Sequence, residues 1–199
     1  KHLKWLIPVF IIAFCFLGFL IAPNDPEAMD IVNKYAAPSV DFPLGTDQFG
    51  RCELSRLLYG GKVTLGIVLL GGSIVLVLGT LIGLWLGQAN AAKSLAFSSL
   101  LDAVTAIPPL AYLIIFVGIW GNSIPTMLVA LTVSLILRMI KLVKTQTELE
   151  LDKAYVLCAV SSGASRSRVL FVHILPNIIR PLVHFLCLSC AEMIMNISA

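Results

Sequence analysis

Charged side chains are scarce in this sequence of 199 residues: Asp, Glu, Lys and Arg make up 13% of it, and hydrophobic residues make up 58%. Soluble domains carry roughly 25% charged residues. The composition, with a mean hydropathy of +0.95, therefore excludes a soluble globule and indicates a membrane protein. The net charge is only +3, from 14 basic and 11 acidic residues scattered along the chain. We expect lipid around most of the chain and no nucleic-acid partner.

The residues that catalytic and metal sites need are also missing. The sequence has no Gly-x-x-x-x-Gly-Lys-Ser/Thr phosphate loop, so it cannot hydrolyse ATP by that device. Its three histidines are dispersed, and its five cysteines make no disulfide framework. An intramembrane hydrolase, the enzyme alternative, needs a paired nucleophile and base or two carboxylates at one depth, whereas Asp102 and Glu192 are isolated. We predict no enzyme activity, no catalytic residue, no metal site and no cofactor bound by this chain.

Charge-free runs mark the predicted membrane spans, because a bilayer core of about 30 Å needs roughly 20 apolar helical residues. One span is predicted over residues 5–22 and another within residues 63–92. Residues 103–137 are too long for one crossing, and the turn residues 121–125 divide them into two helices. A last apolar segment covers residues 174–199. The predicted fold class is all-α, a polytopic membrane helical bundle with about five transmembrane helices.

The basic residues predict how this bundle lies in the membrane, because Lys and Arg are retained on the cytoplasmic side. We expect the N-terminus inside, residues 1–22 as an uncleaved transmembrane anchor, and residues 23–62 as an extracytoplasmic loop. Residues 63–199 then form a core with four further spans. The longest cytoplasmic connection runs from about residue 144 to residue 173. A cytoplasmic partner would bind there.

Three features inside the spans suggest contacts. Gly79, Gly83 and Gly87 recur every four residues and form a helix-packing face, directed either at a helix of this chain or at a partner membrane protein. Glu192 is either a group of a translocation pathway or an interhelical hydrogen-bonding partner. Asp102 lies near the predicted start of the third span, where we expect it to cap a helix N-terminus.

The cytoplasmic connection has the most informative local pattern. Residues 151–163 predict a short helix that Gly163 stops. The residues that follow form an amphipathic run, which Pro176 is expected to end at the membrane surface. By its pattern alone the segment is either an ordinary interfacial loop or a docking element for another protein.

Two separated motifs resemble those of one family. Ala159 and Gly163, followed by the Ile-Leu-Pro of residues 174–176, resemble the coupling-loop motif of ABC importer permeases. Residues 44–51 read Leu-Gly-Thr-Asp-Gln-Phe-Gly-Arg and resemble the Leu-Gly-Thr-Asp-x-x-Gly-Arg-Asp signature of the dipeptide/oligopeptide/nickel subfamily. The resemblance covers nearly all of the chain, implies a type I ABC importer permease fold, and is to the second permease of such transporters, the C-type subunit.

The resemblance implies a permease subunit of an ATP-driven importer in the bacterial cytoplasmic membrane. Its partners would be a second homologous permease, two cytoplasmic ATPase subunits that bind ATP and Mg²⁺, and an extracytoplasmic substrate-binding protein. A coupling loop over residues 148–176 would dock in an ATPase cleft, with Tyr155, Val156 and Leu157 exposed to supply apolar contact. The coupling residues it implies are Ala154, Tyr155, Val156, Leu157, Cys158, Ala159 and Gly163.

The chain departs from the family pattern at three places. Leu157-Cys158-Ala159 stands where the family has Glu-Ala-Ala, and Cys52 stands where it has Asp. Relatives continue beyond the position of Ala199, so we expect a chain truncated at its C-terminus. Residues 156–157 and 192–198 are more similar to nickel-type permeases, so the predicted cargo is nickel or a nickel chelate, with di- or oligopeptides as the alternative. A structural membrane protein without transport is the alternative class.

Overall fold

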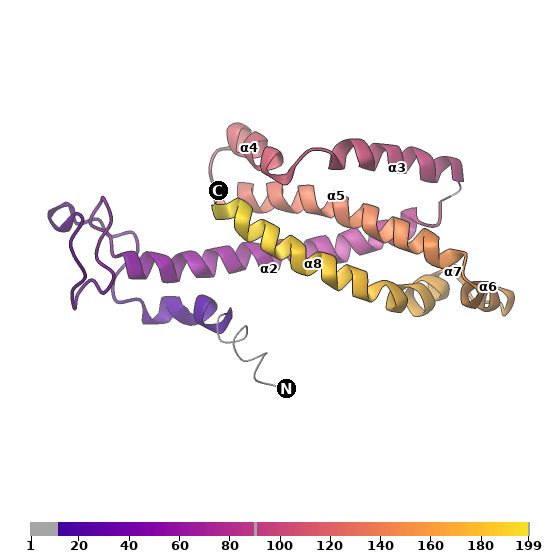
Figure 1. The fold of residues 1–199 in the computed structure, drawn as a ribbon, viewed down its shortest axis with the longest axis horizontal. Helices are drawn as coiled ribbons and strands as arrows, with labels where there is room; N and C mark the ends of the chain where they lie inside the picture. The colour runs from indigo at the N-terminus through magenta and orange to yellow at the C-terminus, as the bar shows by residue number, and fades with distance from the viewer. Residues whose placement is uncertain (1–11, 90, 199) are drawn as a thin grey trace. The chain divides into compact units, whose positions relative to one another are not determined.

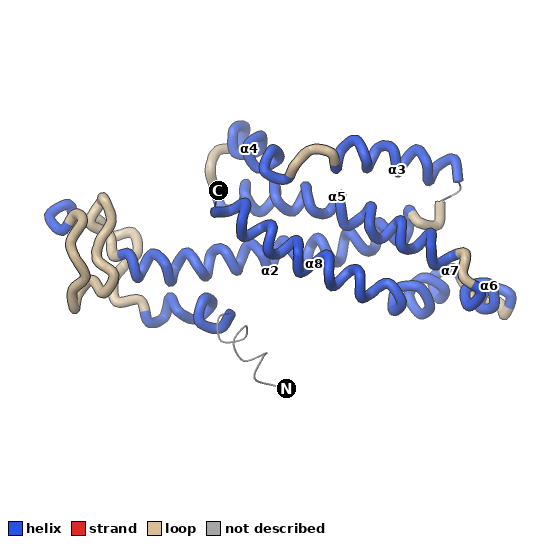
Figure 2. Tube along the Cα trace, viewed as in Figure 1, coloured by secondary structure: helices blue, strands red, loops and turns tan. Residues whose placement is uncertain are grey.

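The computed structural model describes residues 12–89 and 91–198, and within them every regular element is a helix (Figure 1). Apart from one isolated β-bridge between Thr46 and Cys52, the described residues outside the helices are loops and turns (Figure 2). The chain divides into two compact units, residues 1–66 and 67–199. The all-α prediction is confirmed.

The first unit holds a helix at Ile12–Ile21, which ends in the 3₁₀ turn η1 (Gly18–Ile21), and then a long loop that contains the 3₁₀ turn η2 (Ile31–Asn33). The loop leads into the first turns of α2 (Glu53–Leu86). The ammonium of Lys62 lies 3.7 Å from the centroid of the Phe19 ring. The beginning of the predicted first span, residues 5–11, lies outside the described residues.

Helix α2 begins earlier than the charge-free run predicts, already at Glu53 rather than at residue 63. An acidic residue in the first turn is favourable at the positive end of the helix dipole, so Glu53 supports this early start. The basic residues at positions 56 and 62 therefore lie inside a helix and not in a loop. Three helices of the described chain are long and apolar enough to cross a membrane, or four if the bent pair α3–α4 counts as one span.

The third predicted span is broken. Its predicted start, residue 103, falls in the last turn of α3 (Ala91–Thr105), and a break separates this helix from α4 (Pro109–Trp120), with a bend of 72° between the two helices. Pro108 and Pro109 explain the break, since proline disfavours a helical conformation in the residue before it. Asp102 consequently lies in the last turn of α3, so the prediction that it caps a helix N-terminus is wrong. Its carboxylate instead pairs with the ammonium of Lys141, at 2.5 Å.

The predicted turn between the next two helices is present at residues 121–123. Gly121 has φ +81°, and the Ser123 hydroxyl accepts a hydrogen bond from the Thr126 N–H, which caps α5 (Ile124–Leu151). This helix continues well past residue 137, because the charged residues that follow are satisfied by partners on other helices. Arg138 and Lys144, predicted at a span end and in a loop, are therefore both helical residues of α5.

Helix α5 is the centre of the second unit. It contacts α3, α4, α8 (Leu175–Ser198), the short helix α6 (Ala154–Ser161) and the π-helical turn η3 (Val169–Ile174). The core contains fully buried side chains from α2, α5 and α8, among them Val75, Met139 and Met193. The same arrangement is visible in Figure 1, where α8 lies along α5.

The glycine strip, which runs along the end of α2 to Gly87 directly after it, faces α5 of the same chain. A Cβ atom added at Gly79, Gly83 or Gly87 would lie 2.6, 2.5 or 2.6 Å from the nearest atom of Met139, Val143 or Thr147 respectively. Both series advance by four residues in the same direction, so one row of each helix packs along the other with the two helices parallel. The sequence leaves open whether the strip packs against a helix of this chain or against a partner membrane protein. In the structure it packs against a helix of this chain.

The segment before α8 is helical throughout, so the prediction that Pro176 ends a helix is wrong. A short helix α7 (Arg166–Arg168) passes into η3 and then into α8 without an interruption. In η3 the N–H of Leu175 bonds to the Leu170 carbonyl, a wider turn than an α-helix makes. We attribute the continuity to this wide turn, which gives room to the proline ring that would otherwise clash with a carbonyl of the preceding turn.

Candidate functional site

The structure places the predicted coupling residues 154–159 in α6, which lies between α5 and α7 in the chain (Figure 1), and Gly163 just after that helix. Lys153, just before this helix, has an extended backbone, which breaks the chain direction after α5. The helix then ends in two hydrogen bonds of a Schellman motif: Ala164 N–H donates to the Ala159 carbonyl, and Gly163 N–H donates to the Val160 carbonyl. Gly163 has φ +83°, a backbone conformation that favours glycine. The Ala-x-x-x-Gly spacing thus corresponds to one helix stop.

The inner side of α6 is anchored to the rest of the unit. Val156 is 2% exposed and belongs to the hydrophobic core, against which Tyr155 and Ala164 also pack. Glu150, at the end of α5, accepts a hydrogen bond from the Tyr155 hydroxyl at 2.6 Å and pairs with the Lys153 ammonium, also at 2.6 Å. Burial raises the pKa of Tyr155, and its hydrogen bond to the Glu150 carboxylate raises it further. We refer to Glu150, Lys153 and Tyr155 as the Glu150 clasp.

The outer side of α6 is apolar and exposed. Leu157 is 58% exposed, Val160 is 55% exposed, and Cys158 is exposed between them. The prediction that Tyr155 and Val156 are exposed together with Leu157 is wrong, because these two side chains face the core. A run that is apolar on every side, Ala-Tyr-Val-Leu-Cys-Ala-Val, carries no period to identify its buried face. Only the packing against η3 and α5 identifies it.

Glu192 makes an interhelical ion pair. Its carboxylate accepts hydrogen bonds from the Arg138 guanidinium, with Nη1 at 3.1 Å from Oε1 and 3.3 Å from Oε2. The pair joins α5 to α8 in the interior of both helices, and both side chains are partly exposed. A charge inside an apolar span is costly unless it is paired, so each residue accounts for the presence of the other.

Sequence reasoning missed a second polar cluster, which joins α3 to α5. The side chain of Lys144 is 2% exposed, and its ammonium lies 2.8 Å from each of Ser94 Oγ, Ser98 Oγ and Glu148 Oε1. Ser94 also hydrogen-bonds to Glu148. The signal in the sequence is the spacing of four residues in both pairs, 94 and 98 on one helix and 144 and 148 on the other. The sequence pattern places residue 144 in a loop, so the shared helix face of residues 144 and 148 is not recognised.

In the first unit, the signature motif folds around the carboxylate of Asp47. This carboxylate accepts hydrogen bonds from the Phe49 and Arg51 N–H groups at 2.8 and 3.0 Å, and it binds the Arg51 and Arg56 guanidinium groups. Burial opposes ionisation, but these hydrogen bonds, foremost those from Arg51, hold the pKa of Asp47 well below its usual range. The carboxylate thus holds this loop together, and its hydrogen-bonding capacity is largely used by groups of its own chain.

The glycines of this motif are required by close contacts. Gly50 has φ +74°, and a Cβ there would lie 1.6 Å from the Asp30 carbonyl oxygen. Cys52, where the family has Asp, is buried directly before α2. Burial raises the pKa of its thiol, but hydrogen bonds, foremost those from Ser55, lower it overall.

Comparison with known proteins agrees with this architecture. Residues 79–199 match the family described as "Binding-protein-dependent transport system inner membrane component". The chain belongs to this family. The matched residues contain the glycine strip, the Arg138–Glu192 pair and all of α6. The resemblance to ABC importer permeases of the dipeptide/oligopeptide family is thereby confirmed.

The individual relatives are named as peptide permeases. The chain is 34% identical over 195 residues to the peptide transport system permease protein SapC of Salmonella typhimurium, and 31% identical over 191 residues to SapC of Escherichia coli. It is 30% identical over 201 residues to the di/tripeptide transport system permease protein DppC of Pseudomonas aeruginosa. The alignments cover 93% of this chain for both SapC proteins and 98% for DppC. The chain spans 64% of the length of each SapC and 66% of DppC.

Proposed function

We propose that this chain is the membrane-spanning permease subunit of an ATP-driven importer, and that α6 is the element through which a separate ATPase moves it. The observation that carries the proposal is the two-sided character of α6. One side is held in the core by Val156 and by the Glu150 clasp, and the other side exposes Leu157, Cys158 and Val160. A short helix that is anchored on one side and apolar on the other is suited to transmit a displacement.

The anchoring determines which helices would move with α6. The Glu150 clasp connects it to α5, and Val156 belongs to the same core as Ile174 of η3. Because η3 continues directly into α8, a displacement of α6 would be transmitted to both α5 and α8. These are the two helices that the Arg138–Glu192 pair joins, so we include Glu192 as a pathway group whose pairing changes as the helices move.

The remaining subunits follow from this role. A second homologous permease would complete the pathway, two cytoplasmic ATPase subunits would bind ATP and Mg²⁺, and an extracytoplasmic binding protein would deliver the cargo. The complex would lie in a bacterial inner membrane with the N-terminus of this chain inside. The exposed arginines at positions 166 and 168, next to α6, support that orientation because basic residues favour the cytoplasmic side.

We propose a short peptide as the cargo, which revises the preference for nickel that the sequence suggested. The support is that SapC and DppC are named as peptide systems, whereas the preference for nickel rested on residues 156–157 and 192–198. Among the described residues no three His, Cys, Asp or Glu side chains gather into a metal-binding group. A nickel chelate remains the alternative cargo, and a structural protein without transport remains the alternative class.

Crosslinking from Cys158 tests the docking assignment. The full-length chain would retain Cys158 as its one thiol and be assembled with an ATPase that carries a cysteine in its cleft. We expect a crosslink whose yield changes on addition of ATP and Mg²⁺, since Cys158 lies on the exposed side of α6. The matched control moves the thiol to the buried side as Val156→Cys with Cys158→Ala, and it should crosslink poorly. An assembled complex in which Cys158 never crosslinks contradicts the assignment.

Uptake into vesicles that contain the assembled transporter separates the cargoes. We expect ATP-dependent accumulation of a labelled di- or tripeptide, and competition by unlabelled peptide but not by chelated nickel. Accumulation of nickel alone would replace the peptide proposal with the nickel one. An ATP-insensitive crosslink together with no uptake of either cargo would favour the structural alternative.

A further inference from the structure

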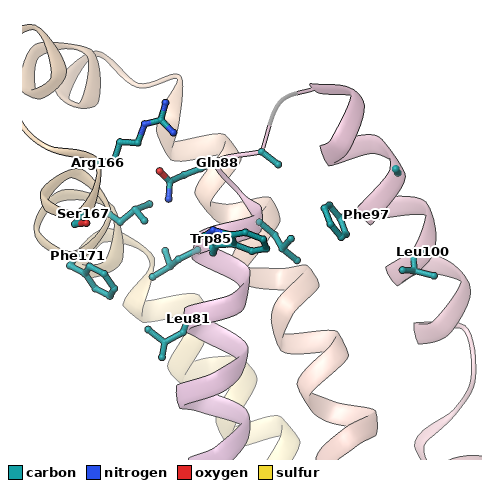
Figure 3. Close-up of a pocket in the computed structure, with 13 residues that line it drawn as sticks. Leu81, Trp85, Gln88, Phe97, Leu100, Arg166, Ser167 and Phe171 are labelled. Carbon is teal, nitrogen blue, oxygen red and sulfur yellow. The ribbon is translucent and has the colours of Figure 1, made fainter.

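A groove of about 920 Å³ lies at the α6 end of the second unit, and no part of the proposed mechanism uses it. It is formed by the last turns of α2, by α3, and by α7 with the start of η3 (Figure 3). One wall consists of Leu81 and Trp85, which are four residues apart on one face of α2, and of Gln88 in the turn that follows this helix. Phe97 and Leu100 line it from α3, and Phe171 lines it from η3.

Large apolar side chains in this groove are left uncovered by the described chain. Trp85 is 69% exposed, and Leu100 and Phe171 are exposed as well. Trp85 belongs to the final turn of α2, a helix that is apolar and long enough to cross a membrane. Tryptophan at the end of such a helix is typical of the boundary between the acyl chains and the headgroups of a bilayer. The position and the lining of the groove therefore favour an acyl chain.

Arg166 and Gln88 lie toward one end of the groove. Figure 3 shows Arg166 and Gln88 at the same end, whereas Leu81 and Leu100 lie farther along the walls. The thirteen residues that line the groove include one cation, Arg166, and no acidic residue. A ligand with an apolar body and a negative end has the complementary arrangement.

The guanidinium of Arg166 is also available to bind a group from outside this chain. Among the cationic side chains described in the second unit, those at positions 138, 141, 144 and 153 are each paired with a carboxylate of this chain. Arg166, like Arg168 and Arg180, is exposed and forms no ion pair with any described residue, and of these three only Arg166 lines the groove. Its guanidinium is free to bind a phosphate, for which its planar set of donors is well suited.

From this arrangement we infer that the groove binds an anionic phospholipid of the surrounding leaflet, with an acyl chain along Trp85 and the headgroup phosphate on Arg166. The headgroup would lie between α7 and the end of α2 and would contact both. Because α7 directly follows α6 in the chain, the bound lipid would brace the base of the proposed coupling segment. The inference rests on the membrane fold and not on the identity of the cargo.

Quenching of Trp85 by brominated lipids tests this inference. The full-length protein, with Trp85 as its one tryptophan, would be reconstituted with the subunits with which it purifies. Brominated phosphatidylglycerol and brominated phosphatidylcholine would be titrated separately. We expect half-maximal quenching at an about fivefold lower mole fraction of the anionic lipid, the selectivity that one Arg near a headgroup provides. The substitution Arg166→Gln should abolish this difference, and Arg166→Lys should keep most of it.

The matched control is Arg168→Gln, which removes the same charge from the same short helix at a position that does not line the groove. It should leave the selectivity in place, and equal losses from the two glutamine variants would overturn the inference in favour of a general surface charge effect. Equal quenching of the unsubstituted protein by both lipids would also overturn it. So would a Trp85 that neither lipid quenches, because another protein segment then fills the groove. Relief of quenching by soluble glycerol phosphate would assign Arg166 to a free phosphate instead.

Discussion

The packing of α2 against α5 makes a quantitative prediction for Gly83→Ala. A Cβ at this position would lie 2.5 Å from Val143 Cβ and 3.0 Å from the Ile140 carbonyl oxygen. Carbon atoms in contact normally lie about 3.5–4.0 Å apart, so roughly 1 Å of separation is missing. The position of Val143 Cβ is set by its own backbone, and no rotation of the side chain moves it. The two helices themselves must therefore separate.

The expected cost combines two opposing contributions. Overpacking of a filled core costs about 1–3 kcal/mol, and the exchange of Gly for Ala in a helix returns about 1 kcal/mol. We expect a net loss of up to about 2 kcal/mol, which lowers the thermal midpoint of a domain of this size by up to about 8 °C. Thermal unfolding of the purified protein in detergent, followed by far-UV circular dichroism, measures the shift.

The matched control is Gly118→Ala in α4, because a Cβ there meets nothing within 4 Å. This control carries only the gain in helix propensity, so its midpoint should be unchanged or slightly raised. Removing the opposing Cβ with Val143→Gly should relieve the G83A clash in a double-mutant cycle, whereas Val143→Ala, which keeps that atom, should relieve it much less. A G83A protein as stable as G118A would refute the close approach of the two helices.

Three further predictions concern the site. Gly163→Ala should raise amide hydrogen exchange in α6 about 5- to 30-fold, because a side chain at φ +83° costs about 1–2 kcal/mol, and Gly163→Asn should raise it less. Glu192→Gln should destabilise the protein by about 1 kcal/mol and lower its thermal midpoint accordingly. The charge-swapped R138E/E192R protein should regain most of this stability, and equal losses in the two variants would argue against the pair. The protection factor for hydrogen exchange around Asp47, which compares the observed rate with the intrinsic rate at the same pH, should be constant above the ordinary pKa of 3.8 and decrease as the pH falls below it. The folded loop holds the carboxylate ionised, so Asp47→Asn should remove this pH dependence of the protection.

Several local features could be predicted from the sequence because their causes are local. The spans follow from the cost of charge in a bilayer, and the turn before α5 follows from Gly121 and Ser123. The stop of α6 follows from Gly163, whose positive φ is set by its own steric freedom. Each of these depends on a residue and its immediate neighbours, so no knowledge of distant contacts is needed.

Other features depended on residues that are distant in the sequence. Lys144 looks like a loop residue until Ser94 and Ser98 of another helix are placed beside it. Pro176 looks like a helix end, because its sequence does not reveal the wider π turn that precedes it. In both cases the local sequence pattern is read correctly. A partner on another helix in the first case, and a wider backbone turn in the second, changes the structure that results.

The sequence by itself determined that this chain is a helical membrane protein of the importer permease family, since composition, span length and the two motifs are all properties of the linear chain. Only the tertiary structure decided which side of α6 is buried. Every residue from Ala154 to Val160 is apolar or only weakly polar, so no periodicity distinguishes Val156 from Leu157. Their difference arises from contacts with α5 and η3, because burial is a property of what lies next to a side chain in space.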